Sequence, residues 1–128
     1  MEVNRIDHLV LTVKNIDVTV QFYTSVMGMK EIEFGEGRKA LSFGQQKINL
    51  HQLGNEFESK ALNVKASSES LCFIIDTPIT EAIKDIESKG VKVIEGPVSR
   101  TGALGTIHSA YFRDPDANLI EVSNYAVV

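Results

Sequence analysis

Apolar and polar residues alternate along residues 5–13, RIDHLVLTV, which is the pattern of a β-strand with one buried face. The next stretch, NIDVTVQFYTSVMGMK, has the spacing of an amphipathic helix, with Asp17 as the expected N-cap and Gly28 as the stop. Three strand-like runs follow, KEIEF, KALSFG and QKINLHQ, separated by the turn-like sequences GEG and GQQ. The first half therefore predicts the order β-α-β-β-β over residues 5–53.

The second half repeats this order after a polar linker at residues 54–69. SLCFIID predicts a strand, PITEAIKDIESKG a helix that ends at Gly90, and VKVIEGP, HSAYFRD and NLIEVSN three further strands. The segment EGPVSRTGALGTI is expected to be a glycine-containing loop that the first half has in a shorter form. We predict that residues 70–125 form a second βαβββ module, so that residues 1–128 make one domain of two related halves.

Sliding the chain along itself brings these halves into correspondence. The first strands coincide when His8 is placed on Ser70, and ALSFGQQKINLH coincides with AYFRDPDANLIE when His51 is placed on Glu121. Because residues two apart share a face of a strand, all four side chains fall on the face opposite the apolar one. The helices should cover the apolar face. An α+β fold is expected, in which the paired modules curve a mixed sheet around a cleft that holds these residues.

Composition narrows the class of partner. The chain has 128 residues and a formal net charge of −4, which gives no basic footprint for nucleic acid or anionic membranes, so a small molecule is the expected partner. No apolar run approaches the roughly 20 residues that span a bilayer, and the start MEVNRIDHL lacks a signal-peptide pattern, so we expect a cytoplasmic protein. With Cys72 as the single cysteine, a metal site would have to use His, Asp or Glu.

Two imidazoles and a carboxylate on one face form a reasonable ligand set for a divalent ion, with Zn, Ni, Mn and Fe all acceptable. Such an ion would polarise a substrate oxygen or activate bound water. The alternatives are structural: His8 and His51 as hydrogen-bonded strand residues, and Glu121 in a salt bridge with Arg113. The sequence contains no G-x-S-x-G elbow, P-loop or G-x-G-x-x-G after a strand, so the metal site is the most specific hypothesis available.

Several other residues have a functional and a structural interpretation. Arg100, in the predicted loop, could bind a substrate carboxylate or phosphate, or simply be a solvated cation. His108 either lines the site or begins a strand at the surface. Cys72 is expected to be a small buried hydrophobic residue. RDPDAN at residues 113–118 is turn chemistry.

The chain resembles the vicinal oxygen chelate superfamily of glyoxalases, bleomycin- and fosfomycin-resistance proteins and extradiol dioxygenases. IDHLVLTVKNIDVTVQFYTSVMGM, FGQQKINLH and YFRDPDANLIEVSNY carry the resemblance over nearly the whole chain, and EGPVSRTGALGTIHSAYFRDPD is similar to proteins called glyoxalase domain-containing protein 5 and their bacterial relatives. The resemblance implies metal ligands at His8, His51, Ser70 and Glu121. Ser70 departs from it, because that position often holds histidine.

The resemblance implies a metal-dependent glyoxalase-like lyase or isomerase acting on a small oxygenated substrate. His8, His51 and Glu121 would hold the divalent ion, Glu121 would move a proton, and Arg100, Ser70 and His108 would contact the substrate. An Fe(II) extradiol-type dioxygenase and a metal-free small-molecule binding or resistance protein are the alternatives. The family also implies a homodimer, with sites formed within one chain or between two.

Overall fold

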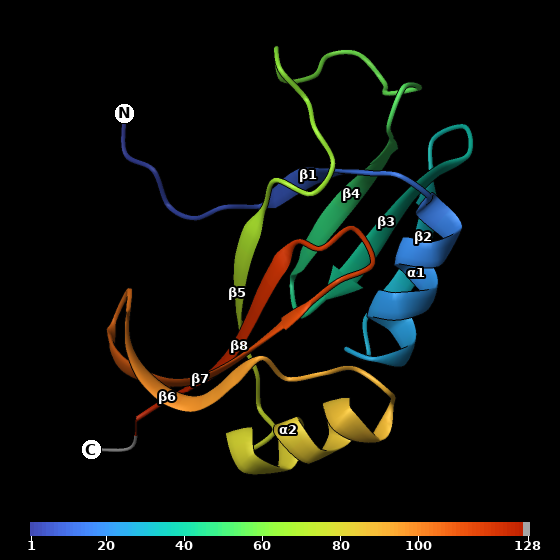
Figure 1. Ribbon diagram of the computed structural model, residues 1–128. Helices are drawn as coiled ribbons and strands as arrows, with labels where there is room; N and C mark the ends of the chain where they lie inside the picture. Colours follow the sequence, from blue (N-terminus) through green and yellow to red (C-terminus); the bar gives the residue numbers. More distant parts are fainter. Residues whose placement is uncertain (127–128) are drawn as a thin grey trace. The chain divides into compact units, whose positions relative to one another are not determined.

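The computed structural model describes residues 1–126 and divides into two compact units, one before and one after the peptide bond between Ser68 and Glu69 (Figure 1). The first unit contains β1 (His8–Val13), α1 (Ile16–Ser25), β2 (Lys30–Phe34), β3 (Arg38–Phe43) and β4 (Gln46–Gln52). Its sheet has the order β1-β4-β3-β2, with β1 parallel to β4 and the other pairs antiparallel.

The second unit has the same topology. It contains β5 (Ser70–Ile74), α2 (Ile79–Ser88), β6 (Glu95–Gly102), β7 (Gly105–Arg113) and β8 (Leu119–Tyr125). Its sheet order is β5-β8-β7-β6, again with the first pair parallel. Each element of one unit thus has a counterpart in the other, which confirms the prediction of two βαβββ modules.

Each helix covers one face of its own sheet, and that face carries the apolar side chains (Figure 1). In the strands and helices these side chains are almost fully buried: Leu11, Val13, Tyr23, Leu41, Ile48 and Leu50 in the first unit, and Ala82, Ile86, Phe112, Ile120 and Val122 in the second. Burial of this apolar area is the main stabilising contribution to each module. The prediction that the helices take the apolar face is confirmed, and the opposite face of each sheet is free for other chemistry.

An amide side chain from the last residues of the parallel strand fixes the start of each helix. Gln52 Oε1 accepts from the backbone N–H of Ile16 at 3.1 Å, and its Nε2 donates to the carbonyl of the β1–α1 loop residue Lys14. Asn124 Oδ1 accepts from the N–H of Ile79 at 2.7 Å, and its Nδ2 donates to two carbonyls of the β5–α2 loop at 2.9 and 3.0 Å. These bonds satisfy helix N-terminal groups that would otherwise lack partners.

Helix α1 begins two residues earlier than a cap at Asp17 would place it. Asn15 is the N-cap, and its side chain accepts from the N–H of Val18 at 3.1 Å. Asp17 instead lies in the first helical turn, where its negative charge favours the positive end of the helix dipole. The prediction of Asp17 as the N-cap is therefore wrong, although Gly28 follows the helix as expected, with φ of 67°.

The predicted loop EGPVSRTGALGTI is an antiparallel hairpin, and this is a second correction. Strand β6 starts at Glu95 and pairs with β7 until Gly102 faces Gly105 across a tight turn, while residues 91–94 of the predicted strand lie outside it. Backbone hydrogen bonds form the ladder whatever the side chains are, so a polar sequence without apolar alternation can still pair. The register shifts between Glu95 and Val98, which marks an irregularity in the strand.

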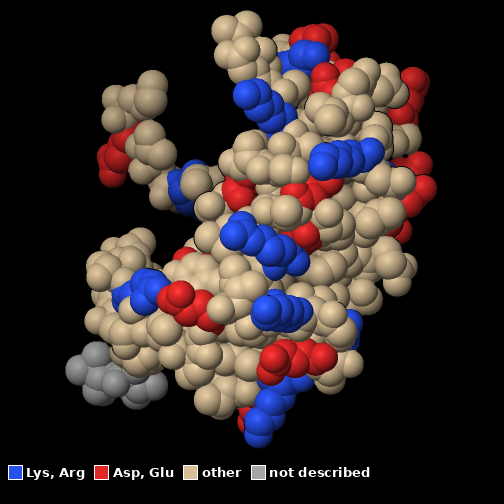
Figure 2. Space-filling model, viewed as in Figure 1, with Lys and Arg blue, Asp and Glu red and all other residues tan. Residues whose placement is uncertain are grey.

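No helix in residues 1–126 combines the length and apolarity that crossing a membrane requires. Figure 2 shows basic and acidic side chains interspersed on the face in view. This mixture of charges agrees with a small molecule rather than nucleic acid as the expected partner.

Candidate functional site

The strand ladders define which positions of the two modules correspond. His8 and Ser70 are the first residues of β1 and β5, and the parallel ladders place Lys47 opposite His8 and Leu119 opposite Ser70. Lys47 therefore corresponds to Leu119. The prediction that His8 corresponds to Ser70 is confirmed by this topology.

Two steps further along the ladder Asn49 corresponds to Glu121, and four steps further His51 corresponds to Ser123. The same count pairs Gln52 with Asn124, whose side-chain amide holds the start of α2 as Gln52 holds the start of α1. The predicted correspondence of His51 with Glu121 is therefore wrong, because the turns before β4 and β8 differ in length, residues 44–45 against 114–118, and one sequence offset cannot cross both.

His8 is at the open edge of the first sheet. Its side chain is 43% exposed, and its Nδ1 lies 2.8 Å from the carboxylate of Asp7. That hydrogen bond lowers the pKa of Asp7 below its usual value. An exposed imidazole with one nitrogen oriented by a carboxylate has its other nitrogen available, which is the usual arrangement of a histidine that binds a metal.

His51 shares the open face with His8 but lies four positions further along the β1–β4 ladder, opposite Thr12. At about 3.3 Å per residue, this separates the two backbones by about 13 Å along the strands. His51 is 7% exposed, and its ring packs edge-on against Phe57 with 5.5 Å between centroids. Burial, and secondarily the charge of Arg38, lowers the pKa of His51, so the ring is neutral at pH 7. The structure does not bring the two histidines together.

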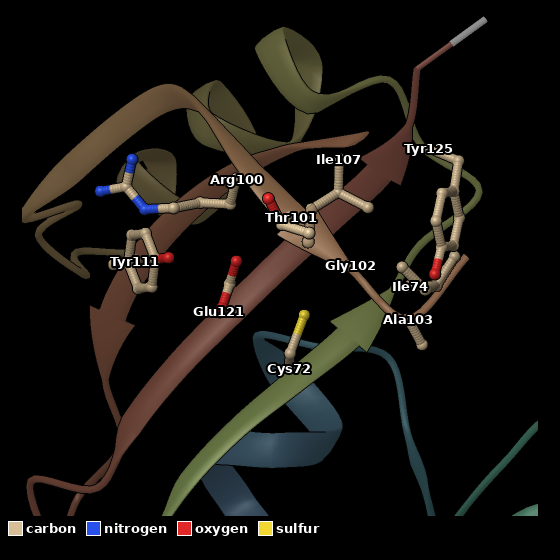
Figure 3. A pocket seen from close by; sticks show the side chains of 10 residues that line it. All are labelled: Cys72, Ile74, Arg100, Thr101, Gly102, Ala103, Ile107, Tyr111, Glu121 and Tyr125. Atoms are coloured by element: carbon tan, nitrogen blue, oxygen red, sulfur yellow. The ribbon is translucent and has the colours of Figure 1, made fainter. Parts of the chain in front are cut away.

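The second unit has a cavity of about 500 Å³ on the open face of its sheet. Figure 3 shows the side chains that line it, contributed by all four strands of this sheet. Glu121 stands on β8, with Tyr111 opposite on β7 and Cys72 opposite on β5. Arg100 reaches the same cavity from β6, so the structure brings Arg100 and Glu121 together, as the predicted substrate contact and proton carrier would require.

Tyr111 lies between these two charged residues. Its hydroxyl points toward the Glu121 carboxylate, while the guanidinium of Arg100 lies 5.5 Å from the centre of the tyrosine ring (Figure 3). Burial and the Glu121 carboxylate raise the pKa of Tyr111, so the phenol keeps its proton at neutral pH. Arg100 is also ion-paired with Glu95. Sequence reasoning missed Tyr111, and only the β7–β8 register, which pairs it with Glu121, could have found it.

Hydroxyl and thiol groups lie beside Glu121. Ser123 Oγ donates to Glu121 Oε2 at 3.5 Å and lies 2.7 Å from Ser109 Oγ, and both serines are fully buried. The thiol of Cys72 lies 3.4 Å from Ser123 Oγ, and burial raises the pKa of that thiol. Cys72 is nevertheless an exposed residue on the cavity face, so its predicted place as a small buried hydrophobic residue is wrong.

The remaining predicted residues of this unit divide between the two faces. Ser70 is exposed on the cavity face of β5, two positions before Cys72. His108 lies on the other face of β7, where its Nδ1 is 3.5 Å from Ser99 Oγ, so it does not line this cavity. Arg113 donates to the carbonyl of Ala117 at 3.4 Å, which leaves the structural alternative of a Glu121–Arg113 salt bridge unsupported.

The donor groups can be compared with those a divalent ion needs. Within residues 1–126 no three His, Cys, Asp or Glu side chains gather in a metal-binding group. Each module supplies one strong donor, His8 or Glu121, on the same face as one weaker donor, the Asn49 amide or the Ser70 hydroxyl. The Asn49 Oδ1 atom is buried and lacks a hydrogen-bond partner among the described residues. A buried oxygen normally has a partner, so this one is available to coordinate a cation. Each pair, taken within its own unit, offers donor types that a divalent ion of intermediate hardness accepts.

Comparison with known proteins places this geometry in a family. The family model described as the Glyoxalase/Bleomycin resistance protein/Dioxygenase superfamily matches residues 5–122. A glyoxalase domain-containing protein of Mycosarcoma maydis and a virulence protein of Salmonella typhimurium are each 54% identical over 98% of this chain, covering 70% and 87% of their own lengths. The solved structure of an integron cassette protein from V. cholerae is 61% identical, with a TM-score of 0.97 and 98% of each chain covered.

Proposed function

Since the chain belongs to the glyoxalase/bleomycin resistance protein/dioxygenase superfamily, we propose that it is a metal-dependent enzyme of glyoxalase type, a lyase or isomerase, acting on a small oxygenated substrate. The observation that carries this proposal is the Glu121 carboxylate on the wall of the second unit's cavity, beside a phenol donor and a guanidinium. A lactoylglutathione lyase of Schizosaccharomyces pombe, 28% identical to this chain, supports the reaction class.

In the second unit we propose Glu121 as the metal ligand, with the Ser70 hydroxyl as a weaker donor, and in the first unit His8 and the Asn49 amide are the corresponding donors. Asn49 replaces His51 in this proposal, because the ladder gives it the position that Glu121 has in the second module. A divalent ion bound by these groups would polarise a substrate oxygen and acidify the neighbouring C–H bond. Zn, Ni, Mn and Fe all accept such donors.

The residues of the cavity then have distinct tasks. Arg100 binds an anionic group of the substrate, since its guanidinium is oriented by Glu95 and by the ring of Tyr111. One oxygen of Glu121 accepts the proton that leaves the substrate carbon and returns it to the product. The Tyr111 phenol holds the carboxylate in place by donating to it, and it stays protonated because its pKa is raised.

A second candidate is a metal-free binding protein, which the volume of the cavity, about 500 Å³, and its partly apolar lining by Ile74, Ile107 and Tyr125 favour. The Fe(II) dioxygenase alternative needs two histidines beside the carboxylate. Because His51 lies four positions along the ladder from His8, we do not propose it.

Elemental analysis and ligand binding of four proteins would test the proposal: the wild type, Glu121→Gln, Arg100→Gln and the control His108→Gln, whose side chain lies on the other face. We expect Glu121→Gln to lose the metal, and Arg100→Gln to keep the metal but bind oxoanionic substrates such as 2-oxo acids roughly tenfold more weakly. Full metal occupancy in Glu121→Gln would refute the metal site. Tight ligand binding that survives a chelator would favour the metal-free candidate.

We also propose that the protein acts in the cytoplasm as a homodimer. Exposed apolar side chains on the open faces, Val10 and Ile32 in the first unit and Ile74 in the second, support self-association. A single free cysteine is compatible with a reducing compartment. Light scattering on the purified chain would measure the mass, and a monomer at micromolar concentration would refute the dimer.

A further inference from the structure

The open face of the first sheet has a charge pattern that the proposed reaction does not use. Among the strand residues on this face, the charged ones are all cations: Lys30, Arg38 and Lys47. The acidic residues Glu31 and Glu33 of the same sheet are on the other face, where both form ion pairs with Lys39. The sheet therefore separates its charges, with one cationic surface and one surface on which two carboxylates share a lysine.

Two phenyl rings hold two of these cations. The guanidinium carbon of Arg38 lies 4.2 Å above the ring of Phe57, and the ammonium of Lys47 lies 3.9 Å above the ring of Phe34. Within residues 1–126 no carboxylate lies within ion-pair distance of either cation. Stacking occupies the flat face of a guanidinium and leaves the N–H groups at its edge free to donate to an anion.

These rings enclose a cavity of about 470 Å³ in the first unit, lined by Phe34, Gly35, Glu36, Arg38 and Phe57. The ring of Phe57 is supported from behind by the buried His51, so its orientation is fixed by packing. The site combines flat apolar walls, one oriented guanidinium and a nearby ammonium. A planar carboxylate would place its ring against the phenyl groups and its two oxygens on the fork of Arg38. Glu36 is exposed at the tight turn, where water screens its charge.

We infer that this cavity is a binding site for small aromatic carboxylates, with Arg38 as the anion-binding residue and Phe57 and Phe34 as the walls. The site is built from residues of the first unit alone. It does not depend on the metal ion or on the Glu121 cavity proposed above.

Benzoate is the probe, titrated into the full chain and followed by calorimetry and by amide chemical shifts. We expect saturable binding in the wild type and a loss of roughly tenfold or more in Arg38→Gln, because a charge-assisted bidentate contact disappears. Phe57→Leu should also weaken binding. Lys39→Gln is the matched control: it removes the neighbouring cation on the other face of the same strand and should bind benzoate like the wild type.

The uncharged analogue benzamide and inorganic phosphate separate the two parts of the recognition. Benzamide should bind much more weakly than benzoate, and phosphate should fail to displace benzoate at equal concentration. If a variant does not fold, the shifts of the wild-type protein decide: they should concentrate at residues 34–38 and 57. Unchanged binding in both Arg38→Gln and Phe57→Leu, or shifts confined to Arg100, Tyr111 and Glu121, would overturn the inference. Metal content in Glu121→Gln tests the enzyme proposal separately.

Discussion

The two modules share a topology and differ in the chemistry of their open faces. Gln52 and Asn124 occupy corresponding positions and perform the same task, each holding the start of a helix. One residue before Gln52 on β4 is His51, whose buried Nδ1 has no hydrogen-bond partner among the described residues, whereas its counterpart on β8 is the buried Ser123, which donates to Glu121. The positions that build the scaffold are therefore equivalent in function, and the positions that face outward are not.

This difference shows what the repeat constrains. Side chains on the helix face must fill a packed core and satisfy helix ends, so both modules solve the problem in the same way. On the open face, one module carries cations stacked on phenyl rings, and the other carries a carboxylate that accepts from a serine and faces a phenol. Each module can accordingly bind a different chemical group on the same framework.

The largest difference between the two scaffolds concerns the outermost strand of each sheet. Strand β6 is irregular near its start, whereas its counterpart β2 pairs regularly with β3. Gly96 has φ of 138°, and a Cβ there would lie 2.7 Å from the Cα of Ala110. Gly96→Ala should reduce the free energy of unfolding by about 4 kcal/mol or more, because backbone must shift to relieve the clash. Gly37→Ala, in the β2–β3 turn with open space around it, should lose only about 1 kcal/mol. Urea unfolding would measure both, and equal losses would contradict the comparison.

The two amide clamps differ in the number of bonds. Asn124 makes three hydrogen bonds to the start of α2, and Gln52 makes two to the start of α1. At about 1 kcal/mol for each net hydrogen bond, Asn124→Ala should destabilise by about 3 kcal/mol and Gln52→Ala by about 2 kcal/mol. Hydrogen exchange at the amides of Ile16 and Ile79 would localise the effects. A larger loss in Gln52→Ala would break the proposed equivalence.

His51 makes the first module sensitive to acid in a way that the second module, with Ser123 at that position, is not. Its lowered pKa means that the unfolded chain, with a histidine pKa near 6.5, binds this proton before the folded chain does. The contribution of His51 to the free energy of unfolding is therefore complete above about pH 6.5, and it is lost as the pH falls toward the lower pKa of the folded state. Urea midpoints at pH 7.5 and 5.5 should differ less in His51→Gln than in the wild type; an equal pH dependence would exclude His51 as the cause.

The smallest effect concerns Cys72, whose counterpart in the first module is Val10. Cys72→Val gives the second module the residue that the first module has at this position. The free energy of unfolding should change by less than about 0.5 kcal/mol, since both positions are exposed. A loss above about 2 kcal/mol, the range of a buried network, would mean that the thiol contact with Ser123 is structural.

Much of this fold could be predicted from the sequence, because the modules depend on apolar periodicity that is visible in single stretches such as RIDHLVLTV. The open-face positions of His8, Ser70 and Glu121 followed from that periodicity. Of strand β6 only residues 95–97 fell within a predicted strand, because the polar residues 99–101 that continue it pair through their backbones and show no apolar alternation.

The details of the site depended on register, which the sequence does not specify. Letter similarity across two turns of different length shifted the repeat and gave His51 the position that belongs to Asn49. The same lack of register concealed Tyr111, whose importance comes only from lying opposite Glu121. Neither residue has a local sequence pattern that marks its task.

Two statements decide the metal site: Glu121 supplies the ligand of the second module, and the buried His51 of the first module takes no part in binding the ion. Calorimetric titration of Ni²⁺ into the wild type, Glu121→Gln, Asn49→Asp and His51→Gln tests them most directly. We predict that Glu121→Gln binds Ni²⁺ roughly 100-fold or more weakly than the wild type. Removing only a hydrogen-bond partner of a metal ligand can already cost that much affinity, and this variant removes a ligand. Asn49→Asp should bind more tightly, since it adds a carboxylate at the equivalent position, and His51→Gln should match the wild type. Wild-type affinity in Glu121→Gln together with loss of binding in His51→Gln would contradict the account.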